Sequence, residues 1–130
     1  MEETARIYKY KESEFKLRKD TLGLKKRIYY LTRNMNKLTQ EYMGFSMFDL
    51  AEKITGEDIL MASNLIVSEK DEKGNYKYLP RVIELLGEQV NKPDCIFDYE
   101  ADGKLAEALG KELLVSFFIE SGSEIWTSIV

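Results

Sequence analysis

The chain has 130 residues, of which 44% are hydrophobic and 32% charged, a balance typical of a globular domain rather than of a disordered or fibrous chain. Its single cysteine excludes an internal disulfide and suits a reducing cytoplasm, and no stretch approaches the ~20 apolar residues that a membrane span needs. Charge is uneven, because residues 1–40 carry 11 Lys or Arg against 5 Asp or Glu, whereas residues 41–130 carry 8 against 18. We expect one soluble domain that comprises residues 1–130.

Residues 1–19 are predicted to form a β-hairpin. Tyr8 and Tyr10, then Phe15 and Leu17, alternate with charged residues at the period of two that is typical of strands. An isolated hairpin is only marginally stable, so we expect this one to pack on helices or to pair with a strand from elsewhere.

The longest helical pattern covers residues 20–43, and we expect the rest of the domain to be built around this central helix. Its apolar residues recur at steps of four and three and so share one side of a helix, the seam formed by Leu24, Ile28, Leu31, Met35, Leu38 and Tyr42. The remaining surface carries cations and two tyrosines, namely Lys25, Lys26, Arg27, Tyr29, Tyr30, Arg33 and Lys37. This surface is interpreted either as a solvated basic back or as a face that meets a partner.

Residues 46–91 are predicted to form short helices and one charged loop. A hydroxyl three residues ahead of an acid, the capping-box arrangement, marks helix starts at Ser46 and Thr55. Residues 69–77 are charged and contain a Gly-Asn turn, which predicts the loop. Pro80 fits the first position of a further helix that we expect to continue to about Asn91.

Residues 102–130 are predicted to form a C-terminal helix and an apolar tail. Residues 95–99, just before them, are a brief strand candidate with alternate side chains on one face. The helix pattern places four residues in register four apart, namely Leu105, Leu109, Leu113 and Phe117. The tail contains Ile125, Trp126, Ile129 and Val130, and an apolar terminus needs a docking site.

The residue types predict no catalytic residue, cofactor or metal. The absence of histidine excludes Ser-His-Asp and Cys-His catalysis, and Cys95 is interpreted as a buried structural thiol. Asp98, Glu100 and Asp102 match the first half of a calcium loop, but Leu109 stands where the bidentate acid is needed. A hydrolase that uses only carboxylates stays open, although nothing singles out a pair.

Two segments carry a family resemblance: Phe15-Lys-Leu-Arg-Lys-Asp-Thr-Leu-Gly, where a strand leads directly into a long helix, and Asp102-Gly103 ahead of the apolar helix Lys104 to Ile119. In this pattern the chain resembles the tail assembly chaperones of long-tailed bacteriophages. The resemblance implies a protein without enzymatic activity that acts in the host cytoplasm. It also implies binding to the tape measure protein and recruitment of tail tube proteins.

The candidate partner-binding residues form two groups. The first lies on the basic helix and comprises Lys25, Lys26, Tyr29, Tyr30, Arg33 and Lys37, and the second is apolar and comprises Phe117, Phe118, Ile125, Trp126 and Ile129. The opposite charges of the two parts of the chain favour a homo-oligomer with head-to-tail contacts. The alternative function is a small regulatory or nucleic-acid-binding protein that uses Lys25 to Lys37, although a pI of about 5.0 argues against nucleic acid. The expected fold class is mainly α with a small β element (α+β), a compact helical domain with an N-terminal β-hairpin.

Overall fold

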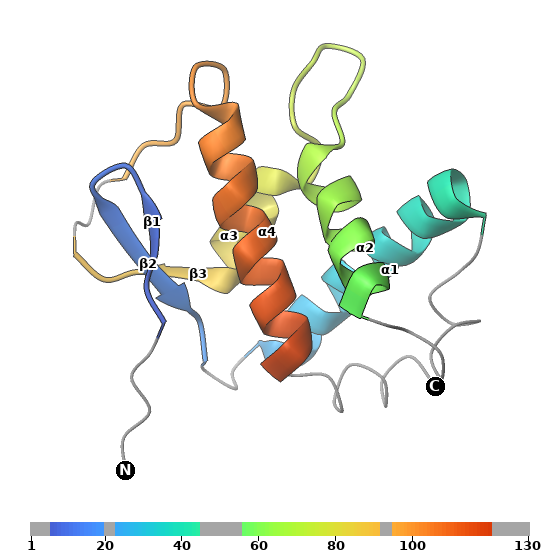
Figure 1. Cartoon of the computed structure of the whole chain (residues 1–130), viewed down its shortest axis with the longest axis horizontal. Helices are drawn as coiled ribbons and strands as arrows, with labels where there is room; N and C mark the ends of the chain where they lie inside the picture. Colours follow the sequence, from blue (N-terminus) through green and yellow to red (C-terminus); the bar gives the residue numbers. More distant parts are fainter. Residues whose placement is uncertain (1–5, 20–22, 45–55, 92–94, 121–130) are drawn as a thin grey trace.

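The computed structural model describes residues 6–19, 23–44, 56–91 and 95–120. In these ranges four helices and a three-stranded antiparallel sheet form a small, mainly helical α+β fold, which confirms the predicted fold class (Figure 1). The elements in chain order are β1 (Tyr8–Tyr10), β2 (Ser13–Leu17), α1 (Leu24–Met43), α2 (Gly56–Ser68), α3 (Leu79–Leu86), β3 (Gly87–Gln89) and α4 (Gly103–Glu120). The helix predicted to start at Ser46 and the apolar tail lie outside the described residues.

Strands β1 and β2 form the predicted hairpin. Tyr8 lies opposite Phe15 in the antiparallel register, and a tight turn at Lys11, with φ of 54°, joins the strands. Because alternate residues of a strand point to opposite faces, Tyr8, Tyr10, Phe15 and Leu17 are all buried on the side that faces the helices.

The third strand replaces part of a predicted helix. Helix α3 has its proline in the first turn, as predicted, but it ends at Leu86 and not near Asn91. Gly87 adopts an extended conformation while its N–H still bonds the carbonyl of Ile83, so the chain leaves the helix there. Residues 87–89 then pair with β2, which supplies the partner strand that the hairpin needed.

Helix α1 buries most of the predicted seam. Leu31 and Met35 have no exposed surface, and Ile28 and Leu38 are buried beside them. Tyr42 does not belong to the buried seam: it is 53% exposed because it lies in the last turn, beyond the α1 residues that are buried. Arg27, which was expected on the surface, is 5% exposed at the edge of the seam, one turn before Leu31.

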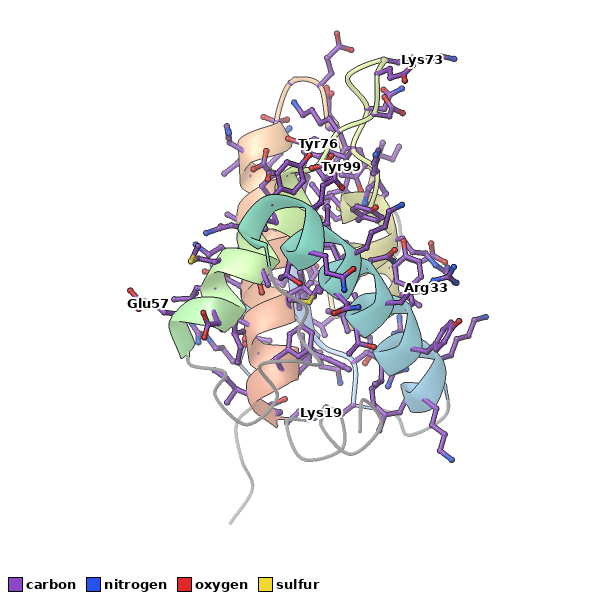
Figure 2. All side chains as sticks on the ribbon, turned by 90° about the vertical axis from the view of Figure 1, so that its right-hand side faces the viewer. Lys19, Arg33, Glu57, Lys73, Tyr76 and Tyr99 are labelled. Atoms are coloured by element: carbon purple, nitrogen blue, oxygen red, sulfur yellow. The ribbon has the colours of Figure 1, made fainter. Side chains whose placement is uncertain are left out.

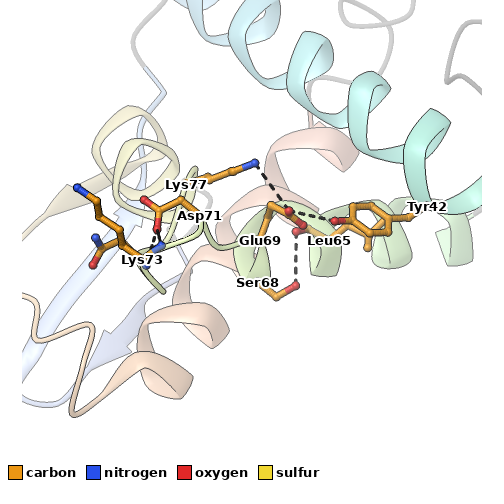
Figure 3. Close-up of polar contacts among 8 residues, drawn as sticks. Tyr42, Leu65, Ser68, Glu69, Asp71, Lys73 and Lys77 are labelled. Carbon is orange, nitrogen blue, oxygen red and sulfur yellow. Dashed lines mark hydrogen bonds and ion pairs between the residues drawn. The ribbon is translucent and has the colours of Figure 1, made fainter.

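Polar contacts join the C-terminal end of α1 to the end of α2 (Figure 3). The hydroxyl of Tyr42 donates to Oε1 of Glu69 at 3.0 Å, and Nζ of Lys77 lies 3.9 Å from the same oxygen. In the adjoining loop, Oδ1 of Asp71 accepts the backbone N–H groups of Lys73 and Asn75 at 2.9 and 3.0 Å. The charged loop predicted for residues 69–77 is therefore confirmed and is held by its own aspartate.

Helix α4 is in contact with both the sheet and other helices. It packs against α2, α3, β1 and β2, and Figure 1 shows it between the sheet and α2, whereas α1 packs on α2 and α3. Gly110 permits this close packing, because a Cβ at this position would lie 2.5 Å from Cδ1 of Leu79 and 3.2 Å from Cγ1 of Val67. The core therefore depends on both long helices.

The register predicted for α4 is wrong at one residue. Leu109, Leu113 and Phe117 are buried, but Leu105 is 50% exposed. A helix turns about 100° per residue, so a side chain four residues further along lies about 40° further round the helix axis. Three such steps separate Leu105 from Phe117, so these two side chains lie about 120° apart. The full buried set includes the residues between these positions, namely Ala106, Leu109, Gly110, Leu113, Leu114, Phe117 and Phe118.

Residues 95–99 are not a strand, contrary to the prediction, but their side chains alternate as predicted. Cys95, Phe97 and Tyr99 are partly buried, whereas Ile96 is 87% exposed. Phe97 packs on Tyr10 with ring centroids 4.5 Å apart, so aromatic contacts rather than backbone pairing hold this segment against the sheet.

Candidate partner-binding surfaces

The exposed side of α1 forms a basic face, defined here as Lys25, Lys26, Tyr29, Arg33 and Lys37. At about 100° per residue these five positions fall within an arc of about 120°, on the side opposite the buried seam. All five side chains are exposed, and Figure 2 shows Arg33 projecting outward from the helix. Within the described residues, no ion pair joins any of the four cations to an acid. The face therefore presents four positive charges to solvent or to a partner.

An exposed tyrosine lies among these cations. The guanidinium carbon of Arg33 lies 5.9 Å from the ring centroid of Tyr29, and its Nη1 lies 3.4 Å from the hydroxyl. Tyr29 itself is 64% exposed, so both groups are accessible. A guanidinium beside an exposed ring is suited to contacts with acidic side chains, phosphates or nucleobases.

Tyr30 does not join the basic face. It is partly buried where α1 meets α3, and burial is the main cause of its raised pKa. The guanidinium of Arg81 lies 5.8 Å from its ring and also pairs with Glu84 at 2.8 Å. Tyr30 is thus part of a contact between helices.

The apolar group of candidates is not a surface in the described structure. Phe117 and Phe118 are 3% and 2% exposed and pack edge to face with each other, so they belong to the core of the folded domain and not to its surface. They lie on the face of α4 that contacts the other elements. Ile125, Trp126 and Ile129 lie outside the described residues.

A second exposed surface, which was not predicted, runs along α4. Its residues recur at steps of three, four, three and four and fall within an arc of about 80°, opposite the buried face. We call them the α4 stripe: Leu105, Ala108, Glu112, Val115 and Ile119. Leu105 is 50% and Ile119 71% exposed, and Val115 is half-buried. The sequence does contain a pattern that indicates this stripe, namely the same alternating steps of three and four as in α1. The prediction placed Leu105 on one face with Leu109 instead.

The α4 stripe borders a hollow of about 360 Å³ beside α2, which we call the α2–α4 groove. Leu60, Ala108 and Val115 supply its apolar lining. Its polar lining consists of Arg6, Lys111, Glu112 and Ser116. An apolar lining with a few charged groups is the usual composition of a binding site for a protein segment.

Strand β1 fixes one side of this groove. The hydroxyls of Tyr8 and Ser116 are hydrogen-bonded, which ties β1 to α4. The guanidinium of Arg6 lies 5.2 Å from the centroid of the Tyr8 ring. Arg6 is therefore held near the groove by a cation–π contact.

Two acids of the calcium-like pattern, Asp98 and Asp102, have partners within the protein. The carboxylate of Asp102 forms an ion pair with Lys11, and the hydrogen bond that Lys11 donates to Asp102 raises the pKa of this lysine. Oδ1 of Asp98 accepts the N–H of Ala101 at 2.9 Å. In the ranges that the structure describes, no group of three or more His, Cys, Asp or Glu side chains is arranged to hold a metal.

The hydroxyl of Tyr76 is held by a carboxylate of α4. Its hydroxyl donates to Oε2 of Glu107 at 2.5 Å, and burial together with this bond raises the pKa of Tyr76 to about 12. Figure 2 shows it close to Tyr99, whose ring centroid is 5.9 Å away. A phenol with this pKa stays protonated at neutral pH, so the contact ties the 69–77 loop to α4 and supplies no base.

No protein family, curated protein or solved structure matched the chain when it was compared with them. None of the described helices is long and apolar enough to cross a membrane. The basic face of α1 and the groove beside the α4 stripe are the exposed features suited to a partner.

Proposed function

We propose that this protein is a tail assembly chaperone of a long-tailed bacteriophage, which binds the tape measure protein and recruits tail tube subunits during tail assembly. The observation that carries the proposal is the α4 stripe. Leu105 and Ile119 remain largely exposed after the domain has folded around its own core. Apolar side chains aligned on one helix face are what a helical client needs for docking.

The stripe supports reversible binding. Covering a whole Leu or Ile side chain contributes about 1.5–3 kcal/mol, so the exposed parts of Leu105 and Ile119 offer roughly 1–2 kcal/mol each. Association also has an entropic cost, which takes up part of this gain. The resulting affinity suits a chaperone that holds its client and later leaves.

The basic face of α1 offers a second contact, which we assign to an acidic surface of a tube subunit or of another copy of this chain. Such a contact would allow head-to-tail oligomers, because the basic face of one copy would meet a different, acidic surface of the next copy. Light scattering at two salt concentrations tests the oligomer. Larger particles at low salt support it, and a monomer at both salt concentrations contradicts it.

Co-expression with a tape measure protein from the same phage tests the proposed function. We expect the client to remain soluble with the native protein and to precipitate with the double variant Leu105→Asp and Ile119→Asp. Ile96→Asp is the matched control, because Ile96 is 87% exposed and lies outside α4. A client that is equally insoluble with or without the native chaperone would refute the proposal.

Nucleic-acid binding is the second candidate, and the basic face of α1 is the observation that favours it. Four cations beside an exposed tyrosine match the combination of phosphate pairing and base stacking. If all four contact phosphates, the logarithm of the affinity for duplex DNA should fall with the logarithm of salt at a slope of about 4. Absence of binding at low salt, or binding that Arg33→Glu leaves unchanged, would exclude this function.

A further inference from the structure

Helix α4 presents a regular exposed face beside a hollow, and this arrangement specifies the shape of a partner. We infer that the α4 stripe and the α2–α4 groove bind one amphipathic helix, whose apolar face is flanked by an acidic residue that pairs with Lys111 and Arg6. This inference rests on the proposed chaperone function and names the part of the client that is bound.

The spacing of the stripe favours a helical partner. Steps of three and four give the period of 3.5 residues at which two helices keep their side chains in contact. From Leu105 to Ile119 the stripe is roughly 21 Å long, or about four turns of helix. Ala108, near its middle, has the shortest side chain of the stripe and allows the backbone of a second helix to approach closely.

The hollow supplies a place for an anchoring side chain. Leu60 of α2 is 41% exposed and lines the groove opposite Ala108 and Val115 of α4. Its volume of about 360 Å³ is at the lower end of the range of binding pockets and suits large apolar side chains rather than a whole helix. The client helix would therefore lie on the α4 stripe and insert part of its apolar face beside α2.

Charge at the groove selects among amphipathic helices. Its lining contains two cations, Arg6 and Lys111, and one acid, Glu112. Within the described residues, no ion pair joins Glu112 to either cation. The lining thus carries an excess positive charge, which favours an acid on the client and disfavours a lysine at the same place.

Two synthetic helical peptides test the inference. Both carry leucines at alternating steps of three and four, and they differ only in a Glu or a Lys beside the apolar face. We expect the Glu peptide to bind the native protein about tenfold more tightly than the Lys peptide, a difference of about 1.4 kcal/mol. Lys111→Glu should reverse the preference, and Ala108→Trp should weaken both peptides at least tenfold by filling the groove.

Lys104→Glu is the matched control for charge, because this side chain of α4 is 94% exposed and does not line the groove. Circular dichroism is used to check that each surface variant is folded. Peptide affinities that Ala108→Trp and Lys111→Glu leave unchanged would overturn the inference. If these variants leave peptide binding unchanged but the protein still keeps the tape measure protein soluble, the chaperone function stands and only the groove site is refuted. If the peptides bind in the groove but the tape measure protein is not kept soluble, the chaperone function is refuted and the groove site stands.

Discussion

Two leucines one turn apart on α4 test the packing directly. Leu109 is 1% exposed, whereas Leu105, one turn earlier and about 40° further round the helix, is 50% exposed. Leu109→Ala removes buried methyl groups and leaves a cavity, so we expect a loss of about 2–5 kcal/mol in the free energy of unfolding. Leu105→Ala removes a side chain that is half in water, and alanine is the best helix former, so the expected loss is about 1 kcal/mol or less.

Urea unfolding followed by far-UV circular dichroism measures both variants, with the slope against urea as a check on the two-state assumption. Both variants replace Leu with Ala in one helix, so the change in helix propensity is the same for both. A difference between their free energies of unfolding therefore reports the difference in burial. Equal losses for the two variants would refute the division of α4 into a buried face and an exposed stripe.

Three further predictions concern stability and charge. Gly110→Ala should cost about 1 kcal/mol or more, because the new methyl would lie 2.5 Å from Cδ1 of Leu79, whereas Gly56→Ala meets nothing within 4 Å and should be neutral or stabilising in the same urea assay. Burial raises the pKa of Tyr99 to about 12 from 10.0, so the folded state favours the protonated phenol. The contribution of this pKa shift to the free energy of unfolding is complete below pH ~10 and is lost as pH rises towards ~12. Tyr99→Phe should reduce this loss of stability, as measured by unfolding curves at several pH values. Arg33→Glu should weaken low-salt association of the protein with an acidic partner, as measured by light scattering, and leave stability within about 0.5 kcal/mol.

Much of the fold follows from periodicity in the sequence. The α1 seam and the alternation in β1 and β2 each repeat at the period of one element, so one segment is enough to assign the buried side. The end of α3 was missed because Val90, four residues after Leu86, continues the apolar pattern. The strand that follows forms only because β2, distant in sequence, offers an unpaired edge.

The groove could not be predicted from the sequence without knowing which helices are neighbours. Leu60 and Val115 are distant in sequence, and no local pattern indicates that they line the same hollow. The stripe itself was present in the sequence as alternating steps, but the apolar run near the end of α4 hid which side is buried. The exclusion of Phe117 and Phe118 from the surface likewise depends on the packing of α4 against its neighbours.

The central claim is that the exposed face of α4 binds a helix of the tape measure protein. Titration of isotope-labelled protein with such a helix, followed by two-dimensional NMR of its amide groups, tests the claim most directly. We expect saturable shifts at Leu105, Ala108, Val115 and Ile119 and at Leu60 across the groove, with little change on α1. Shifts confined to α1, or no shifts at all, would contradict the claim.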